Sequence, residues 1–292
     1  MRLMSWNIQW AKGADGRVEP VRIADYLTAQ QPDIIALQEV CNNYPANTGD
    51  SFADQPAWFE QAFRQQSGAV WQTLFSPATD RFHPESGLRQ QFGNLIATHY
   101  PIAEVRHHTL PRPVDAAHPG SPRAALELLL QTPLGWIRFI TTHLEYYSTR
   151  QRTAQAAYLY RLHEEGCGWH RDPITPPNIS DTPLRTLPTT DQTLICGDLN
   201  APPDNPEIMQ LLAPAELTCV GLYDGWRLTH PDQPHPPTLG LNTSGFSREQ
   251  AFCADYLLGS RCTLNRIESF TVDDQVTFSD HQPLIIDFKE PT

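Results

Sequence analysis

The stretch Thr193-Leu-Ile-Cys-Gly-Asp-Leu-Asn200 decides how the rest of the chain is interpreted. Its apolar part, Leu194 to Cys196, predicts a buried strand, and Gly197 allows the backbone to turn tightly after it. Asp198 and Asn200 occupy alternate positions, so their side chains leave the strand end on one face. A carboxylate and a carboxamide in this place suit a hard cation and a phosphate oxygen. Taken alone, the stretch fits equally well a strand that ends in an ordinary Asp/Asn turn.

Polar residues of similar chemistry stand beside several other apolar runs. They are Asn7 after Trp6, Glu39 after Leu37-Gln38, His143 after Thr141-Thr142, Asp255 after Ala254, and Asp280-His281 after Ser279. The set is rich in oxygen and holds no cluster of thiolates, which favours Mg²⁺ or Mn²⁺ over structural zinc. The two histidines suit proton transfer and stabilisation of charge on a phosphoryl oxygen.

The apolar pattern predicts an α/β chain. Two strand-rich halves, with helices between strands in each, favour two sheets packed face to face and covered by helices. Strands are expected at 2–7, 33–39, 69–75, 92–98, 124–131, 136–142, 194–196, 252–258, 263–272 and 283–288, and helices at 19–30, 56–66, 152–165 and 205–212. We expect one domain over residues 1–292, with long loops around 41–55, 76–91, 107–122, 166–191 and 228–250.

Composition limits the classes of partner. Lys+Arg 21 against Asp+Glu 33 gives a net charge of −12, which is unfavourable for tight, nonspecific binding to DNA. A phosphate substrate remains compatible with that charge, because bound divalent cations supply a positive field locally. The six cysteines form no C-x-x-C pair, which favours a reducing compartment. Without a signal-peptide h-region or an apolar run of ~20 residues, we expect a cytoplasmic, monomeric protein with no membrane insertion.

The motifs together resemble those of the endonuclease/exonuclease/phosphatase superfamily, which includes deoxyribonucleases, sphingomyelinases and inositol polyphosphate phosphatases. The matching segments occur in the family's order along nearly the whole chain. They are SWNIQ at 5–9, LQEV at 37–40, GNLIATHYPI at 93–102, PRAALEL at 122–128, TTHLE at 141–145, GDLNAPP at 197–203, DYLL at 255–258 and SDHQPLI at 279–285. The resemblance implies a four-layer α/β sandwich with two mostly antiparallel sheets, which agrees with the apolar pattern.

The resemblance also implies a role for each polar residue. Glu39 would be the main ligand of Mg²⁺ or Mn²⁺, with Asn7 and Asp280 near or on the metal. Asp198 would orient or deprotonate the attacking water, and Asn200 would hold a phosphate oxygen. His281 would act on the phosphate, oriented by Asp255. His143 would bond a phosphate oxygen or protonate the leaving group, and Arg123 would contact the phosphate.

Three functions remain open at this point. The residues favour hydrolysis of a phosphodiester, in a nucleic acid, a lipid or a small molecule. The first alternative is a phosphomonoesterase acting on a sugar, nucleotide or lipid phosphate. The second is a binding protein that kept the fold and lost activity, against which the intact acidic and histidine residues argue. A Ser/His/Asp hydrolase is more distant, because the chain has no G-x-S-x-G motif.

Overall fold

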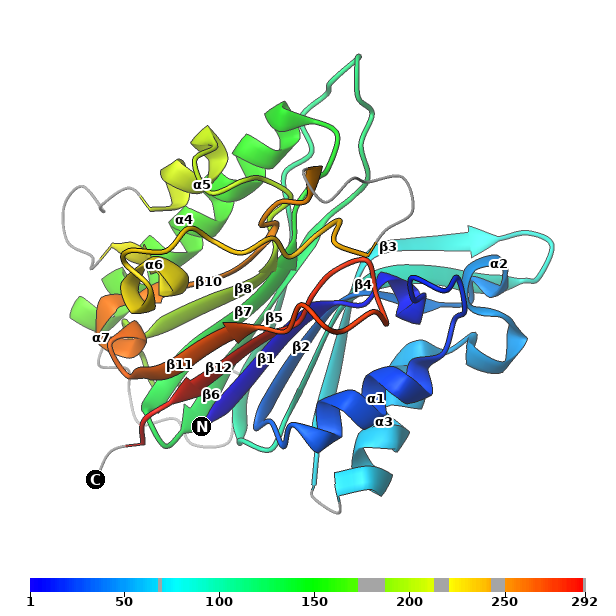
Figure 1. Ribbon diagram of the computed structural model, residues 1–292. Coiled ribbons are helices and arrows are strands. Elements are labelled where there is room, and N and C mark those ends of the chain that lie inside the picture. Colours follow the sequence, from blue (N-terminus) through cyan, green and yellow to red (C-terminus); the bar gives the residue numbers. More distant parts are fainter. Residues whose placement is uncertain (68–69, 173–186, 213–220, 243–249, 291–292) are drawn as a thin grey trace.

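Two sheets of six strands each form the centre of the molecule. The structure is a computed structural model, and it describes residues 1–67, 70–172, 187–212, 221–242 and 250–290 (Figure 1). The first sheet has the order β11 (Ile267–Val272), β12 (Leu284–Phe288), β1 (Arg2–Asn7), β2 (Ile34–Asn42), β4 (Leu88–Thr98), β3 (Gln72–His83). The second has the order β5 (Ile102–Thr109), β6 (Ala124–Thr132), β7 (Gly135–His143), β8 (Thr193–Asp198), β10 (Asp255–Ser260), β9 (Leu222–Asp224).

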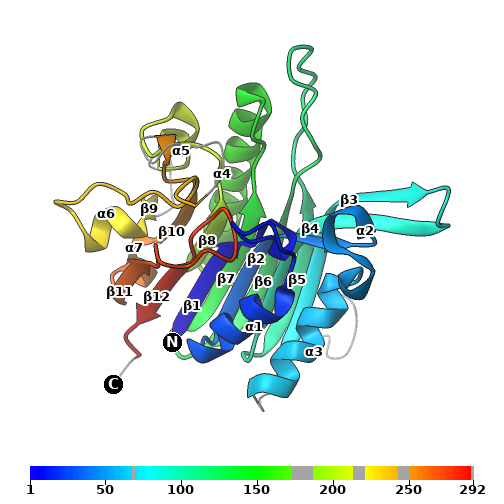
Figure 2. The ribbon, with the colours of Figure 1, turned by 45° about the vertical axis from the view of Figure 1, so that its right-hand side comes forward.

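Helices cover the outer face of each sheet. The helices are α1 (Pro20–Ala29), α2 (Pro45–Thr48), α3 (Gln55–Ser67), α4 (Thr149–Arg171), α5 (Pro206–Leu211), α6 (Gly225–Thr229) and α7 (Arg261–Leu264), with short 3₁₀ turns η1 (Gln9–Ala11) and η2 (Asp50–Phe52). In Figures 1 and 2, α1 and α3 lie on the side of the first sheet, and α4 and α5 lie on the side of the second. The predicted four-layer α/β sandwich is therefore confirmed.

Three hydrophobic clusters hold these layers together. One lies between the sheets and joins Leu3, Ile34 and Ile96 of the first to Leu126 and Phe139 of the second. A second packs the outer face of the first sheet against α1 and α3, and a third packs the outer face of the second sheet against α4 and α5. Both faces of the central strands are thus buried, and successive residues of a strand enter different clusters, as the two-residue period of a strand requires.

The strand directions explain why the polar residues gather at one edge. β1 runs parallel to β2, and β7 runs parallel to β8, so the carboxyl ends of all four strands lie on the same side. β12 is antiparallel to β1, and β10 is antiparallel to β8. The beginnings of β10 and β12 therefore reach the same edge as those carboxyl ends. Asp255 thus opens a strand, and the pair Asp280-His281 precedes one. The sequence had placed Asp255 in the middle of a strand expected over 252–258.

The loop expected at 76–91 is wrong, because this segment forms most of a long β-hairpin. β3 and β4 pair from Gln72↔Thr98 to His83↔Leu88, and the tight turn between them ends at Gly87 with φ 68°. Pro77 misled the sequence interpretation. It sits on an edge strand where the register shifts between Pro77 and Thr79, one of the few places where a strand accepts proline. The hairpin projects well beyond the sandwich (Figure 2).

The other four expected loops are shorter than the sequence indicated. β2 continues to Asn42, and α2 and η2 occupy much of 43–55. β5 continues to Thr109, α4 to Arg171 and α6 to Thr229. Residues 173–186 and 243–249 of the remaining loops lie outside the described part of the chain. The strand expected at 263–272 begins only at Ile267, because α7 occupies the residues before it.

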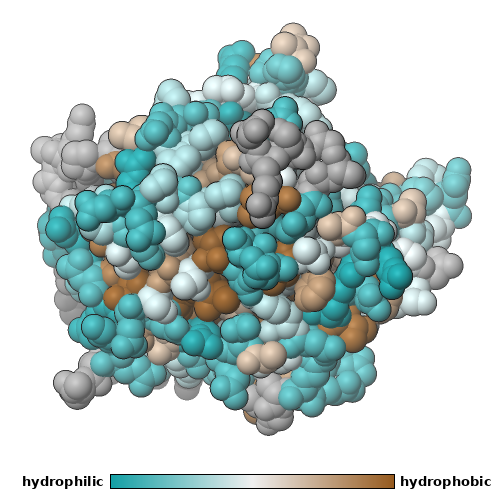
Figure 3. Space-filling model, in the orientation of Figure 1, coloured by the Kyte–Doolittle hydropathy of each residue, from teal (hydrophilic) through white to brown (hydrophobic). Residues whose placement is uncertain are grey.

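The face of the molecule seen in Figure 3 is mostly hydrophilic, and hydrophobic residues are exposed there in small patches between polar ones. Among the residues that the structure describes, no helix has the length and apolar character needed to cross a membrane.

Candidate active site

A β-bulge turns Glu39 toward the space between the sheets. Along β2, Ile35 and Leu37 face the helices, so regular alternation would direct Glu39 outward with them. The register against β4 instead shifts between Leu37 and Val40, and Glu39 adopts a left-handed φ of 61°. Its Oε1 then lies 3.2 Å from Asn7 Nδ2, and 3.9 Å from His143 Nδ1 of the second sheet. A backbone distortion thus places this carboxylate in the polar cluster.

Strained backbone also places the residues at the end of β8 and just after it. Gly197 has φ 130°, and a Cβ there would lie 2.0 Å from the carbonyl oxygen of Thr142, so only glycine fits beside β7. Asn200 adopts a left-handed φ of 52°, and its backbone N–H donates to Asp198 Oδ1 at 2.9 Å. Conformations of this kind in non-glycine residues are costly and concentrate at functional sites.

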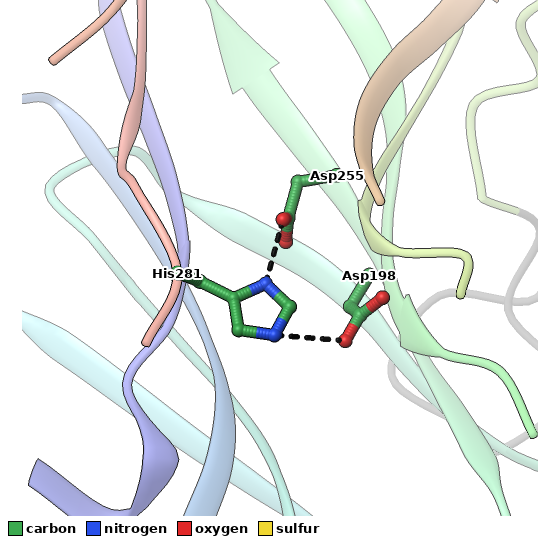
Figure 4. A group of neighbouring side chains, drawn as sticks. All are labelled: Asp198, Asp255 and His281. Carbon is green, nitrogen blue, oxygen red and sulfur yellow. Dashed lines mark hydrogen bonds and ion pairs between the residues drawn. The ribbon is translucent and has the colours of Figure 1, made fainter. Parts of the chain in front are cut away.

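His281 is held between carboxylates of the opposite sheet. Its Nδ1 lies 2.7 Å from Asp255 Oδ2, and its Nε2 lies 3.6 Å from Asp198 Oδ2. Figure 4 shows the imidazole entering from one side of the cluster and the two carboxylates from the other. His281 lies three residues before β12, and Trp6 Nε1 holds it in this position by donating a hydrogen bond to its carbonyl at 3.0 Å. The predicted pairing of Asp255 with His281 is therefore present in the structure.

Thr238 supports Asp255, and the sequence interpretation missed it. The Thr238 hydroxyl donates to Asp255 Oδ2 at 2.6 Å and accepts the backbone N–H groups of Ala254 and Asp255 at 2.9 and 3.0 Å. Thr238 lies within a stretch expected to be only a loop, and a lone threonine there carries no sequence signal. Its effect is to fix the carboxylate that orients His281.

His143 and Asn200 form a second contact on the β7–β8 side. Asn200 Nδ2 lies 2.9 Å from His143 Nε2 and donates to the Leu144 carbonyl at 2.9 Å. Because the amide is a donor, the hydrogen bond requires Nε2 of His143 to be the accepting nitrogen. Burial, the charge of Arg123 and the charge of His281 hold the pKa of His143 well below its usual value. His143 is therefore a neutral imidazole in this arrangement.

Asn7 is central to the cluster as a hydrogen-bond donor. Its Nδ2 donates to Asp198 Oδ2 at 2.9 Å and to Glu39 at 3.2 Å, while its Oδ1 accepts the backbone N–H of Gln9 at 3.1 Å. The amide nitrogen, and not the oxygen, thus faces Glu39. The role of Asn7 as a metal ligand stays a prediction.

Arg123 and Asp280 each contact a residue that the sequence analysis did not single out. Arg123 is buried, and its Nε lies 3.5 Å from Glu145 Oε2. Its charge adds to the lowering of the His143 pKa by burial and opposes the rise that burial causes in the pKa of Glu39. Asp280 accepts a 2.6 Å hydrogen bond from Gln9 Nε2. Glu145 and Gln9 were not singled out from the sequence, although each lies inside a matching family segment. All nine predicted site residues are thus near one edge of the sandwich.

Burial and like charges set the electrostatics of the site. Burial raises the pKa of Asp198 to about 7, although the charge of His281 opposes the shift. Burial by itself would lower the pKa of His281, but the charges of Asp255 and Asp198 outweigh it and raise the pKa to about 10. His281 is therefore a cation at neutral pH, held beside two carboxylates.

Two sets of residues have the chemistry to hold a divalent cation. Asp198, Asp255 and His281 offer ligand atoms within 4.8 Å of one another. However, Asp255 and His281 already satisfy each other through a short hydrogen bond, which a cation would have to break. Glu39 and Asp280 fit better, because burial raises the pKa of both carboxyls and the charge of Asp280 raises the pKa of Glu39 further. Neighbouring buried carboxylates are the donors that Mg²⁺ and Mn²⁺ prefer.

The fold and this cluster define a class of protein: α/β sandwiches with a histidine–carboxylate centre at one edge of the paired sheets. Residues 4–281 match the model of the Endonuclease/Exonuclease/phosphatase family, and the chain belongs to that family. No curated protein sequence matches the chain. Family membership indicates a hydrolase that acts on phosphate esters, and enzymes of this family are generally dependent on a divalent metal ion.

Solved structures show the same fold. An endonuclease/exonuclease/phosphatase from Beutenbergia cavernae aligns with a TM-score of 0.68 and 23% identity, covering 99% of this chain and 71% of that one. The human Nocturnin catalytic domain, solved with a bound sulfate anion, aligns with a TM-score of 0.63 and 19% identity, covering 100% and 94%. A mannosyl-6-phosphatase from Bacteroides thetaiotaomicron aligns with a TM-score of 0.62 and 14% identity, covering 99% and 98%.

Proposed function

We propose that this chain is a divalent-metal-dependent hydrolase that cleaves a phosphodiester by attack of water at phosphorus. The observation that carries the proposal is the convergence of His281, Asp255 and Asp198 from two different sheets within hydrogen-bond or ion-pair distance. Such a cluster of charges is costly to bury and needs a compensating use. The substrate class remains a phosphate ester in a nucleic acid, a nucleotide, a lipid or a small molecule.

Different residues of the chain would have different roles at the phosphate. Asp198 would accept a proton from water, whose oxygen forms the new bond to phosphorus. His281, charged and fixed by Asp255, would donate a hydrogen bond to a phosphoryl oxygen that gains negative charge. Asn200 and Arg123 would position the phosphate from the β7–β8 side. The ester P–O bond breaks, and its oxygen would take a proton from solvent water and leave as an alcohol, while Asp198 returns its proton to solvent.

The cation would be held by Glu39 and Asp280, with Asn7 beside them. We propose Mg²⁺, with Mn²⁺ as a substitute, because the donors are oxygens. When bound, the cation would neutralise charge on a phosphate oxygen and make attack by water easier. Asn7 would hold Glu39 and Asp198 in fixed relative positions, as its two hydrogen bonds do here.

The first experiment compares a diester with a monoester. Hydrolysis of bis(p-nitrophenyl) phosphate and of p-nitrophenyl phosphate is measured with Mg²⁺, with Mn²⁺ and with chelator. The proteins are wild type, His281→Ala and, as a matched control, His83→Ala at the far end of the β3–β4 hairpin. Diester cleavage that needs metal and is lost only in His281→Ala supports the proposal.

Two other outcomes would change the assignment. Preference for the monoester would move the function to the phosphomonoesterase alternative, a kind of activity that the name of the Bacteroides thetaiotaomicron structure records for that protein. No hydrolysis of either compound, together with no binding of Mn²⁺, would exclude the enzyme and leave a binding protein on this fold.

A further inference from the structure

A pocket of about 240 Å³ opens beside the polar cluster, at the base of the β3–β4 hairpin. Six of its lining residues matter for its chemistry: the aromatic residues Trp10, Tyr44 and Phe92, the small hydroxyl residues Thr79 and Ser121, and Arg81. Among the described residues that line it, Arg81 is the only charged one. The whole chain carries a net charge of −12, whereas none of these described lining residues carries a carboxylate.

The pocket adjoins the candidate active site on several sides. Trp10 follows Asn7 by three positions, and Ser121 precedes Arg123 by two. The ring of Phe92 lies 6.5 Å from the ring of His143, measured between centroids. The Ser121 N–H donates at 2.9 Å to Glu145, the carboxylate that pairs with Arg123. A phosphate held by Arg123 and His143 would therefore place its ester substituent at the mouth of this pocket.

Two features indicate that the pocket is built to hold a ligand. The Thr79 hydroxyl is buried and has no hydrogen-bond partner within the protein, although Thr79 lines the cavity. The second feature is the turn that presents Trp10. Gln9, Trp10 and Ala11 have φ values of 45°, 45° and 65°, a run of left-handed non-glycine residues that costs free energy at each step.

The strained turn is held by specific contacts. Gln55, which is fully buried, donates from Nε2 to the Trp10 carbonyl at 2.8 Å, and Gln9 Nε2 donates to Asp280. The same turn thus joins the wall of the pocket to the carboxylate that we place near the metal. Persistence of such strain next to a reactive cluster favours a role for Trp10 in binding.

We propose that this pocket is a specificity subsite for a planar aromatic ring that is attached to the scissile phosphate and carries a second anionic group. The ring stacks against Trp10 and Phe92, and the second anion reaches Arg81. The proposal rests on the proposed function, because it assigns a substrate class to the same site. A nucleotide has this chemistry, either as a free small molecule or as the end of a nucleic acid strand.

Three substrates that share p-nitrophenol as the leaving group test the proposal. Methyl p-nitrophenyl phosphate has no ring on the retained side. The p-nitrophenyl ester of thymidine 5′-phosphate adds a ring, and the same ester with a 3′-phosphate adds the second anion. We expect kcat/KM to rise at each step. Stacking of one base on an aromatic side chain corresponds to about 1–3 kcal/mol, or roughly five- to 150-fold.

Variants connect each step to a residue. Trp10→Ala is expected to lower the ratio of kcat/KM between the thymidine ester and the methyl ester by about tenfold, through KM. Arg81→Gln is expected to lower only the gain from the 3′-phosphate. Arg89→Gln is the matched control, because Arg89 is an exposed arginine of the same hairpin, paired with Asp80, and does not line the pocket. Equal ratios in all proteins would overturn the subsite.

A binding measurement separates this proposal from the proposed function. Isothermal titration calorimetry with thymidine 3′,5′-bisphosphate reports binding even if no ester is cleaved, and it does not depend on Trp10 as a reporter. Binding that Trp10→Ala weakens, without any hydrolysis, would keep the subsite and reject the function. Hydrolysis without any preference for the ring-bearing substrates would support the proposed function and reject the subsite. Competition between the bisphosphate and a short oligothymidylate with a 5′-phosphate then distinguishes a free nucleotide from a strand end.

Discussion

His281 Nδ1 and Asp255 Oδ2 are 2.7 Å apart, although they belong to different sheets. Asp255 opens β10 in the second sheet, and His281 precedes β12 in the first. Thr238 holds the same carboxylate oxygen at 2.6 Å, which fixes the orientation of the acceptor. The hydrogen bond between His281 and Asp255 therefore sets both the orientation of the imidazole and its positive charge.

Asp255→Asn is expected to lower kcat for diester hydrolysis by about 10²- to 10⁴-fold, the range typical of a lost acid–base partner. The amide keeps the shape of the side chain but removes the charge that holds His281 protonated. The matched control is Asp33→Asn, because Asp33 accepts a 2.6 Å hydrogen bond from the Arg2 N–H where β1 and β2 begin, at the opposite end of these strands from the site. Steady-state kinetics and thermal unfolding of both variants check the prediction. Similar kcat values in the two would contradict it.

Glu39→Gln is expected to weaken binding of Mn²⁺ by at least about tenfold, because a neutral amide is a poorer ligand than a carboxylate. Isothermal titration calorimetry with MnCl₂ gives the affinity without reference to activity. Glu268→Gln, on the exposed side of β11, is the control and should bind Mn²⁺ like the wild type. Unchanged affinity in Glu39→Gln would place the cation elsewhere, for example between Asp198 and His281.

Gly197→Ala is expected to lower the free energy of unfolding by about 2–4 kcal/mol, because the added Cβ collides with the Thr142 carbonyl and the backbone has φ 130°. Gly168→Ala is the matched control. Its Cβ would meet no atom within 4 Å, and alanine is the better helix former, so we expect a gain of up to about 1 kcal/mol. Urea unfolding of both variants measures the difference, and equal stabilities would refute the steric argument.

Stability is expected to fall in acid through Glu127. Its carboxylate is buried, and although burial raises its pKa, His108 and Arg138 lower the pKa to about 2. A lowered pKa means that the stabilisation is complete above the unfolded-state value near 4.5 and is lost as the pH falls toward 2. Glu127→Gln should therefore be less stable at pH 7, by an amount on the order of 3 kcal/mol.

The difference in free energy of unfolding between wild type and Glu127→Gln should shrink as the pH falls from about 4.5. Urea unfolding at several pH values down to about 3 measures it. A difference that does not depend on pH would show that the ion pairs with Arg138 and His108 do not supply the stability.

The sequence was sufficient for the layers and for most of the site. The apolar runs were continuous, as in strands buried on both faces. The polar residues after β1, β2, β7 and β8 converge because those strands end on one side. Asp255 and His281 reach the same edge for a reason that the sequence does not contain: β10 and β12 are antiparallel to their neighbours. The sequence pattern marked both residues, and the family resemblance supplied their pairing and their roles.

Features that depend on pairing could not be predicted. The bulge that redirects Glu39 exists only because β2 pairs with β4 in a shifted register, and no local residue signals it. The β3–β4 hairpin was hidden by Pro77, which a bulge on an edge strand accommodates. Thr238 and Gln55 act through single hydrogen bonds to distant backbone or side-chain atoms, and such contacts have no pattern along the chain.

The wide separation of the site residues along the chain affects when the chemistry becomes available. Asn7 and His281 are 274 positions apart, yet their side chains lie 3.4 Å from each other. A ribosome must therefore synthesise nearly the whole sandwich before the last histidine can join the first asparagine. Unfinished or truncated chains that lack residue 281 would keep Glu39 and His143 but lose the contact of His281 with Asp255, so we expect premature products of translation to be inactive under the proposed mechanism.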